Sequence, residues 1–175
     1  MVARKKGKIS LLTEALQAER EAVEFFGRSQ TVTQDPSVRQ IFEKLTKEMK
    51  LHVKNLEEIM EKLDLSAPEL KAPSGFYPIS DLQRAECYVC GYAADAESIP
   101  ESCPRCGASR YAFEKEISGK KAWEFAEKGA VAILRMLGEA ERGADARMRS
   151  MMAGHIRLEQ QFLSEARKQI EALKK

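Results

Sequence analysis

The chain carries its four cysteines in two short stretches, Cys87-Tyr-Val-Cys90-Gly-Tyr92 and Cys103-Pro-Arg-Cys106-Gly107. Two thiolates separated by two residues can bend around one ion and leave backbone N–H groups free to face the sulfurs. Two such pairs supply four soft ligands, a set that suits iron or zinc in tetrahedral geometry. No cysteine is left over and no signal peptide is recognisable, so we favour a metal site over two disulfides.

The overall charge of the chain is nearly balanced. Its 175 residues contain 29 Lys and Arg against 27 Asp and Glu, which gives a net charge of +2. This balance provides no electrostatic argument for a nucleic-acid partner. No apolar run approaches the ~20 residues that span a bilayer, so we expect no membrane partner either. We therefore expect a cytoplasmic protein, in a compartment that keeps thiols reduced and able to bind metal.

Two amphipathic helices are predicted before the cysteines, over residues 10–64. Apolar residues recur at helical spacing from Leu12 to Phe26 and again from Ile41 to Leu63. Between these stripes, Asp35 is suited to cap the second helix and Pro36 to occupy its first turn. Each helix therefore has one apolar face to bury.

The cysteine segment, residues 85–115, is predicted to be a small module joined by linkers. Proline and glycine residues punctuate the chain from Ser66 to Pro78. The module is too small to be stable through burial alone, and structural zinc contributes on the order of 10–16 kcal/mol in comparable peptides. Two more amphipathic helices follow over residues 120–174, with a turn expected at Gly138–Gly143. The whole pattern predicts a mainly α four-helix bundle with the module inside its crossover connection.

The two helix pairs resemble each other and carry polar residues in their apolar stripes. The matching segments are Ala18-Glu-Arg-Glu-Ala-Val23 with Ala126-Glu-Lys-Gly-Ala-Val131, and Met49-Lys-Leu-His52 with Met152-Ala-Gly-His155. At ~100° per residue, Glu19 and Glu127 fall in the middle of their stripes. His52 and His155, the only histidines, do the same. Because a buried carboxylate is costly unless paired or metal-bound, we favour a present or ancestral metal site over buried Glu–His pairs.

Two segments of the chain also resemble one known family. The motif Cys-x-x-Cys-Gly-Tyr, a gap of twelve residues and Cys-Pro-x-Cys-Gly, followed by an aromatic at Phe113, is similar to the rubredoxin-like module of rubrerythrins. The segment Glu14-Ala-Leu-Gln-Ala-Glu19-Arg-Glu-Ala-Val-Glu-Phe-Phe26 looks like the opening helix of the same family. Rubrerythrins join a ferritin-like di-iron bundle to a rubredoxin-like Fe(Cys)₄ module.

The resemblance implies a set of cofactors and the residues that hold them. Iron, or alternatively zinc, would bind at Cys87, Cys90, Cys103 and Cys106. One or two irons would bind in the bundle, with Glu19, His52, Glu127 and His155 as candidate ligands. A small aromatic core around the cysteine cage would be made by Tyr88, Tyr92, Tyr111 and Phe113.

Two features depart from the family pattern. Rubrerythrins usually place the rubredoxin-like module at one end of the chain, whereas here it interrupts the bundle. The family's di-iron ligands include a Glu-x-x-His on each of two helices. His52 and His155 match the histidines, but Met49 and Met152 replace the bridging glutamates. A thioether is a poor ligand for a pair of hard ferric ions. The four candidate ligands that remain are enough for one ion but few for two.

Each of several other side chains near the apolar stripes has two possible roles. A missing carboxylate could be replaced by Glu159, Glu48 or Glu124. Each of these residues lies near the edge of an apolar stripe, and we expect its side chain to face solvent on the flank of the helix. Met49 and Met152 are expected to be adaptable core fillers. Their alternative role is cofactor binding, as axial thioether ligands of a haem held between subunits.

The resemblance implies a non-haem iron redox protein. A reductase would pass electrons to the Fe(Cys)₄ centre, which would pass them to the bundle site, where peroxide would be reduced to water. The chain is a peroxide-reducing oxidoreductase only if the bundle binds iron. The alternative is a non-enzymatic scaffold or regulator with zinc in the cage and a vestigial bundle site. We expect a homodimer, in which the long crossover could let subunits exchange helices or modules.

Overall fold

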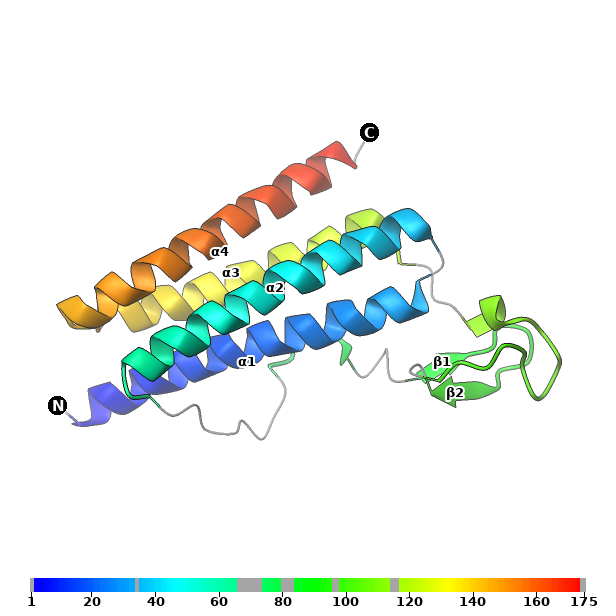
Figure 1. Cartoon of the computed structure of the whole chain (residues 1–175), viewed down its shortest axis with the longest axis horizontal. Coiled ribbons are helices and arrows are strands. Elements are labelled where there is room, and N and C mark those ends of the chain that lie inside the picture. The colour runs from blue at the N-terminus through cyan, green and yellow to red at the C-terminus, as the bar shows by residue number, and fades with distance from the viewer. Residues whose placement is uncertain are drawn as a thin grey trace.

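Over residues 2–33, 35–65, 74–79, 84–95, 98–113 and 117–173, which the computed structural model describes, the fold consists of four long helices and one two-stranded sheet (Figure 1). The helices are α1 (Val2–Val32), α2 (Pro36–Lys62), α3 (Gly119–Arg142) and α4 (Ala146–Ala172). Between α2 and α3 lie β1 (Arg84–Glu86), β2 (Ala93–Asp95) and the short 3₁₀ helix η2 (Arg110–Phe113). The prediction of a mainly α bundle with a small module in its crossover is confirmed. None of the described helices is long and apolar enough for a membrane span.

Capping residues define three of the helix starts. Asp35 caps α2 by accepting from the backbone N–H of Ser37, with Pro36 at the first helical position, as the sequence predicts. Ser118 and Asp145 cap α3 and α4 in the same way. The division into domains at residues 10–64, 85–115 and 120–174 stays a prediction.

The turn expected at Gly138–Gly143 is shorter in the structure. Helix α3 continues through Gly138 to Arg142, and Gly143 is its C-cap residue. Leu137 and Ala140 on either side of Gly138 are fully buried. Their packing holds this segment helical, because tertiary burial outweighs the cost of up to ~1 kcal/mol for a glycine inside a helix.

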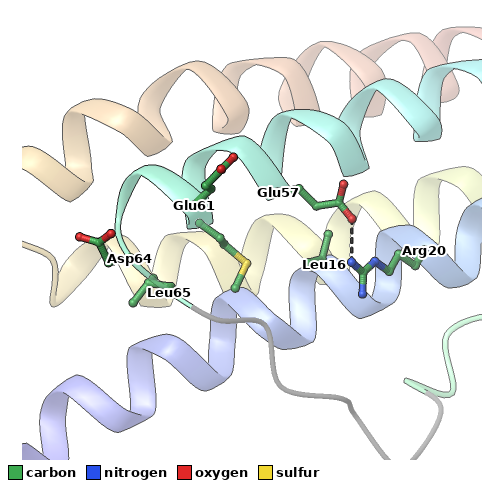
Figure 2. A pocket seen from close by; sticks show the side chains of 7 residues that line it. Leu16, Arg20, Glu57, Glu61, Asp64 and Leu65 are labelled. Atoms are coloured by element: carbon green, nitrogen blue, oxygen red, sulfur yellow. Dashed lines mark hydrogen bonds and ion pairs between the residues drawn. The ribbon is translucent and has the colours of Figure 1, made fainter.

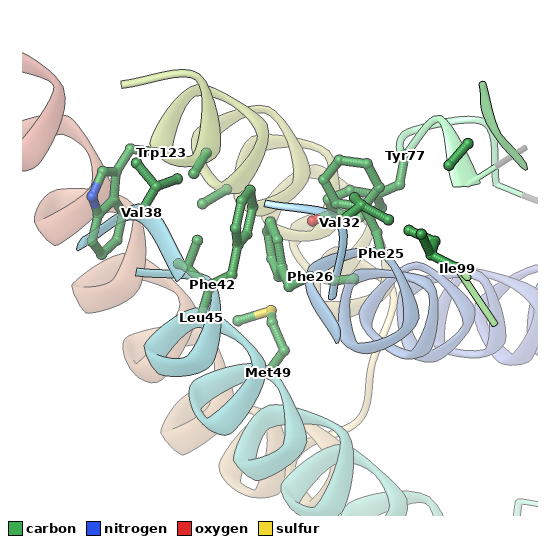
Figure 3. Packing of buried hydrophobic residues seen from close by; sticks show 14 of the residues in the cluster. Phe25, Phe26, Val32, Val38, Phe42, Leu45, Met49, Tyr77, Ile99 and Trp123 are labelled. Atoms are coloured by element: carbon green, nitrogen blue, oxygen red, sulfur yellow. The ribbon is translucent and has the colours of Figure 1, made fainter. Parts of the chain in front are cut away.

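The bundle interior contains two apolar clusters. The module-side cluster includes Phe25, Phe26 and Phe42 of the bundle together with Ile99 and Phe113 of the module. The far cluster is built by residues of all four helices, among them Leu12, Leu56, Ile133 and Met152. Figure 3 shows the module-side cluster, with Ile99 lying against the end of α1 near Phe25 and Val32.

A polar layer lies between the two apolar clusters. Along α1 the far cluster ends at Ala18 and the module-side cluster begins at Ala22, so Glu19 stands between them. Met49 and Leu56 mark the same change on α2, with His52 between them. The three helices α1, α2 and α4 therefore bring their buried polar residues to one level of the bundle.

The module is an antiparallel hairpin followed by a second turn. Ala85 pairs with Ala94, both buried, and the described part of the module lies beyond the end of the bundle where α1 ends (Figure 1). Of the four expected core aromatics, Phe113 is buried and contacts Tyr92, with ring centroids 6.3 Å apart. The prediction is wrong for Tyr88 and Tyr111, which are 80% and 65% exposed. Tyr88 sits between two cysteines of one turn, and because the sulfurs face inward the side chain between them faces solvent.

Candidate metal sites

Two equivalent turns present the cysteines. In the first, Cys87 N–H donates to Tyr92 O at 2.8 Å and Gly91 N–H donates to Cys87 O at 2.8 Å. In the second, Cys103 N–H donates to Ala108 O at 2.7 Å and Gly107 N–H donates to Cys103 O at 2.8 Å. Gly91 and Gly107 have φ of 71° and 75°, a conformation that glycine adopts without strain. Each turn therefore needs a glycine directly after its second cysteine.

The spacing of the four sulfurs fits one tetrahedral ion. Sγ of Cys87 lies 3.7 Å from Sγ of Cys106, and Sγ of Cys90 lies 3.6 Å from Sγ of Cys103. All four sulfurs lie within 4.8 Å of one another. A metal–sulfur bond of about 2.3 Å gives a tetrahedron with edges of about 3.8 Å. Disulfides would need sulfurs about 2.0 Å apart, and all four cysteines are free.

The thiols also influence one another's ionisation. Desolvation raises the pKa of Cys103, but the backbone N–H groups of Arg105 and Cys106 and the neighbouring thiols outweigh this and lower the pKa to about 7. The backbone N–H of Ala108 lowers the pKa of Cys106, but partial desolvation and the three neighbouring sulfurs raise it to about 12. Four sulfurs this close cannot all carry negative charge unless a cation lies among them. The donor set therefore fits iron or zinc.

The second site is a cluster of carboxylates and histidines in the polar layer of the bundle. Glu19 of α1 and Glu159 of α4 are 0% exposed, and His155 of α4 is 1% exposed. Ligand atoms of these three residues lie within 4.8 Å of one another, and Oε1 of Glu19 lies 2.8 Å from Nε2 of His155. His52 of α2 contacts Oε1 of Glu159 through its Nδ1. The cluster thus joins α1, α2 and α4.

Asn55 of α2 sets the orientation of His155. Oδ1 of Asn55 lies 3.1 Å from Nδ1 of His155, and as an acceptor it requires a proton on that nitrogen. Neutral His155 then presents the lone pair of its Nε2 to Glu19, so that without a metal ion the proton in their 2.8 Å contact belongs to Glu19. This is the arrangement of a metal-binding histidine, in which a hydrogen bond from the other ring nitrogen fixes the tautomer.

Burial dominates the electrostatics of the cluster. Burial raises the pKa of Glu19 well above its usual range, and the charge of Glu159 raises it further. Burial also lowers the pKa of His155, although the charge of Glu159 opposes this. Oε2 of Glu19 and Oε2 of Glu159 are buried with no hydrogen-bond partner among the described residues. Two water-excluded carboxylate oxygens without partners are costly, and a cation bound by both carboxylates would compensate for this.

The structure brings together three of the four predicted bundle residues. Glu127 of α3 lies instead at the bundle edge, half-buried, and accepts a 2.8 Å hydrogen bond from Nε of Arg167. Glu159 takes its place in the cluster, so the expectation of a solvated flank is wrong for Glu159. Glu124 is the expected flank, since it pairs with Lys121 at 3.2 Å.

The two methionines are core residues. Met49 is 0% exposed in the module-side cluster, and Met152 is 1% exposed in the far cluster. Together they cover the polar layer from both sides. Their burial does not fit the alternative of a haem held between subunits, because such a haem requires thioethers at the surface.

The cluster also has partners that the helical periodicity did not single out. Asn55 lies one turn after His52, a spacing that places both side chains on one face of α2. Tyr77 lies in the crossover, where its ring is buried and its hydroxyl has no partner among the described residues. Burial raises the pKa of Tyr77, and the charges of Glu159 and Glu19 add to this. The sequence feature that could have indicated a close neighbour such as Tyr77 is Gly129, where the second helix pair departs from the repeat.

The fold and its two clusters define a class: a four-helix protein with a four-cysteine module in its crossover and a buried carboxylate–histidine cluster. Comparison with known families gives two matches. Residues 86–114 match the family "Rubrerythrin, rubredoxin-like domain", and residues 9–76 match "Domain of unknown function (DUF892)". Comparisons with curated proteins and with solved structures found no match. The chain therefore contains a rubredoxin-like module whose cysteine cluster is compatible with iron or zinc.

Proposed function

We propose that this protein is a rubrerythrin-like non-haem iron redox protein, in which an Fe(Cys)₄ centre exchanges electrons with one metal ion in the bundle. The observation that carries the proposal is that ligand atoms of Glu19, His155 and Glu159 lie within 4.8 Å of one another. In addition, Oε2 of each carboxylate is buried with no hydrogen-bond partner among the described residues. Two carboxylates and one imidazole leave open positions on an iron ion, although the two-histidine, one-carboxylate triad of non-haem iron oxygenases has the reverse composition. The proposed bundle site is therefore mononuclear.

The surrounding residues position these three ligands. His52 holds Glu159 through its Nδ1, and Asn55 holds His155 through Oδ1. Met49 and Met152 exclude water above and below the layer. Hydrogen bonds and burial of this kind fix ligand orientation and set the redox potential.

The proposed chemistry is the reduction of hydrogen peroxide. One peroxide takes up two electrons and two protons to give two waters, and the two electrons would come one from each metal. Within one chain the bundle site and the cysteine cage are far apart, because Glu19 lies 13 residues, or about 20 Å along α1, before Val32 at the end of that helix. Phe25, Phe26 and Tyr77 lie between the two sites, with the Tyr77 ring 5.4 Å from the Phe25 ring and 5.6 Å from the Phe26 ring.

The partners that we propose are a reductase and a second copy of the chain. Exposed apolar side chains surround the cage: Tyr88, Val89 and Tyr111 are 80%, 57% and 65% exposed. Cys106 is itself exposed. These features support a docking face at the cage through which a redox partner reaches the metal.

A pair of matched variants tests the bundle site. The purified protein should bind two metal ions per chain, and thiolate-to-ferric absorption should identify iron in the cage. Glu19→Gln should lose the bundle ion, whereas Glu127→Gln, which removes the equivalent carboxylate of the repeat, should keep both ions. The reduced wild-type protein should consume peroxide, and Glu19→Gln should not. Equal metal content in the two variants would contradict the site.

One observation favours the non-enzymatic alternative. Each histidine already contacts a carboxylate, His52 with Glu159 and His155 with Glu19, as expected for buried pairs that stabilise a scaffold. In that case the protein would be colourless, with a single zinc per chain. Glu19→Gln would then reduce the free energy of unfolding without changing the metal content.

A further inference from the structure

A pocket between α2 and α4 leads to the buried cluster. It has a volume of about 250 Å³, and His52 and Phe162 form part of its wall together with Glu48 and Glu165. His52 is only 3% exposed, and its Nδ1 is bound to Glu159. The pocket is therefore separated from the proposed metal ligands by one side chain.

The described residues leave little exposure on the other sides of the cluster. Glu19, Glu159 and His155 are at most 1% exposed, and Met49 and Met152 cover the layer. A larger pocket of about 450 Å³ lies between α1 and α2, but no residue of the cluster lines it (Figure 2). There Arg20 and Glu57 form an ion pair of 2.6 Å over Leu16. Volume alone therefore does not identify the route to the cluster.

The pocket beside His52 carries negative charge. Glu48 lies one turn before His52 on α2, and its Oε2 is buried with no hydrogen-bond partner among the described residues. Glu165 lines the same pocket from α4. Lys44 lies 3.4 Å from Glu165 and also lies over the Trp123 ring at 5.2 Å. The charge of Lys168 acts on Glu165 as well. Glu48 thus presents a carboxylate oxygen with no hydrogen-bond partner among the described residues beside the histidine that closes the route.

We propose that this pocket is the access route for the divalent cation of the bundle site, with Glu48 as the first carboxylate that the cation meets. The inference rests on the proposed function, since it requires a metal ion at Glu19, His155 and Glu159. A cation attracted by Glu48 passes the side chain of His52 to reach Glu159. Glu48 acts on the rate of loading, and the buried ligands set the affinity.

The test measures the rate and the extent of metal uptake separately. The full chain, with zinc in the cysteine cage and an empty bundle site, is mixed with Co²⁺, quenched with a chelator after set times and analysed for bound cobalt. Glu48→Gln should slow uptake roughly three- to tenfold, because one carboxylate attracts the cation in a partly water-excluded pocket. Its final occupancy should equal that of the wild type.

Glu57→Gln is the matched control. It removes the same charge from the same helix, in the pocket that no residue of the cluster lines. The charge of Glu57 contributes to the raised pKa of Glu19, but Glu57 does not line the pocket beside His52, and uptake should keep the wild-type rate. Leu51→Trp, a larger side chain at the pocket rim, should slow uptake with both Glu48 and the ligands intact.

Each other outcome overturns the inference in a recognisable way. Unchanged uptake in Glu48→Gln and Leu51→Trp would show that cations reach the cluster elsewhere. Equal slowing in Glu57→Gln would show that only the net charge of α2 matters. Lower final occupancy in Glu48→Gln would make Glu48 a resident ligand. No cobalt beyond the cage in the wild type, at any time, would remove the proposed bundle site itself.

Discussion

At the residue scale, the approach of Tyr77 to Gly129 depends on the missing side chain of glycine. A Cβ at Gly129 would lie 1.8 Å from the Tyr77 oxygen, whereas a Cβ at Gly138 in the same helix would meet nothing within 4 Å. Both residues lie inside α3, where alanine is intrinsically the better helix former. The same substitution should therefore have opposite effects at the two positions.

We expect Gly129→Ala to lower the free energy of unfolding by about 1–3 kcal/mol, because the Tyr77 ring must leave its packed position. Gly138→Ala should raise it by about 0.5–1 kcal/mol. Urea unfolding of the two variants beside the wild type measures both. Stabilisation by both substitutions would mean that the crossover does not pack on α3 as closely as the structure has it.

Asn55 gives a second residue-scale prediction, on metal affinity. Asn55→Leu removes the acceptor that fixes the tautomer of His155, and such losses typically weaken metal binding by about 10- to 100-fold. Asn55→Asp keeps an acceptor oxygen at the same place and should recover most of the affinity. Metal titration of the bundle site in both variants measures the effect. Equal affinity of Asn55→Leu and the wild type would contradict a positioning role.

The residue scale also shows where sequence reasoning reached its limit. The repeat put Glu19 and His155 correctly in the core, because each lies in the centre of an apolar stripe. It placed Glu127 by the same reasoning, but the partner of Glu127, Arg167, lies on another helix and cannot be seen from periodicity along α3. Glu159 was likewise placed at a stripe edge, yet α4 is oriented so that this edge faces α1 and α2.

At the element scale, the start of α2 makes a prediction on pH. The Ser37 hydroxyl and then the Ser37 backbone N–H lower the pKa of Asp35 by donating to its carboxylate. A carboxyl whose folded-state pKa is lowered adds stability above its unfolded pKa of about 3.9. That stability is lost as pH falls through the folded-state pKa.

Asp35→Ala should therefore destabilise the protein at neutral pH, and the difference from the wild type should shrink as the pH falls below about 4. Ser118→Ala is the control, because this neutral cap of α3 accepts from Lys121 N–H at 3.1 Å and has no charge to lose. Its effect should not vary with pH. Denaturant unfolding at several pH values compares the two, and parallel pH profiles would contradict the charge-based cap.

The elements themselves were largely predictable from the sequence. Apolar spacing identified four helices, and the sequence Asp35-Pro36 marked the start of α2 because both residues act locally. The end of α3 was not predictable, since Gly138 is a turn residue by local preference and helical only through the burial of Leu137 and Ala140. Local chemistry thus decided the starts, and tertiary packing decided this end.

At the scale of the whole molecule, the cysteine module is joined to the bundle through one shared apolar cluster. Ile99 and Phe113 of the module belong to the same cluster as Phe25 and Phe26 of α1. Among the residues that the structure describes, the far cluster around Leu12 and Ile133 contains none from the module. The module has little core of its own, so a bound ion has to supply much of its stability.

Removing the cage metal should therefore loosen the molecule from one end. After chelation under reducing conditions, amides of residues 84–113 should exchange rapidly, those around Phe25 and Phe26 should lose part of their protection, and those from Leu12 to Ala18 should keep it, because the far cluster is intact. Hydrogen exchange measured by mass spectrometry on the full chain follows all three regions. Glu19→Gln with metal in the cage is the control, and its module should stay protected. Uniform loss of protection on chelation would show that the two clusters unfold as one unit and that the cage stabilises the whole bundle.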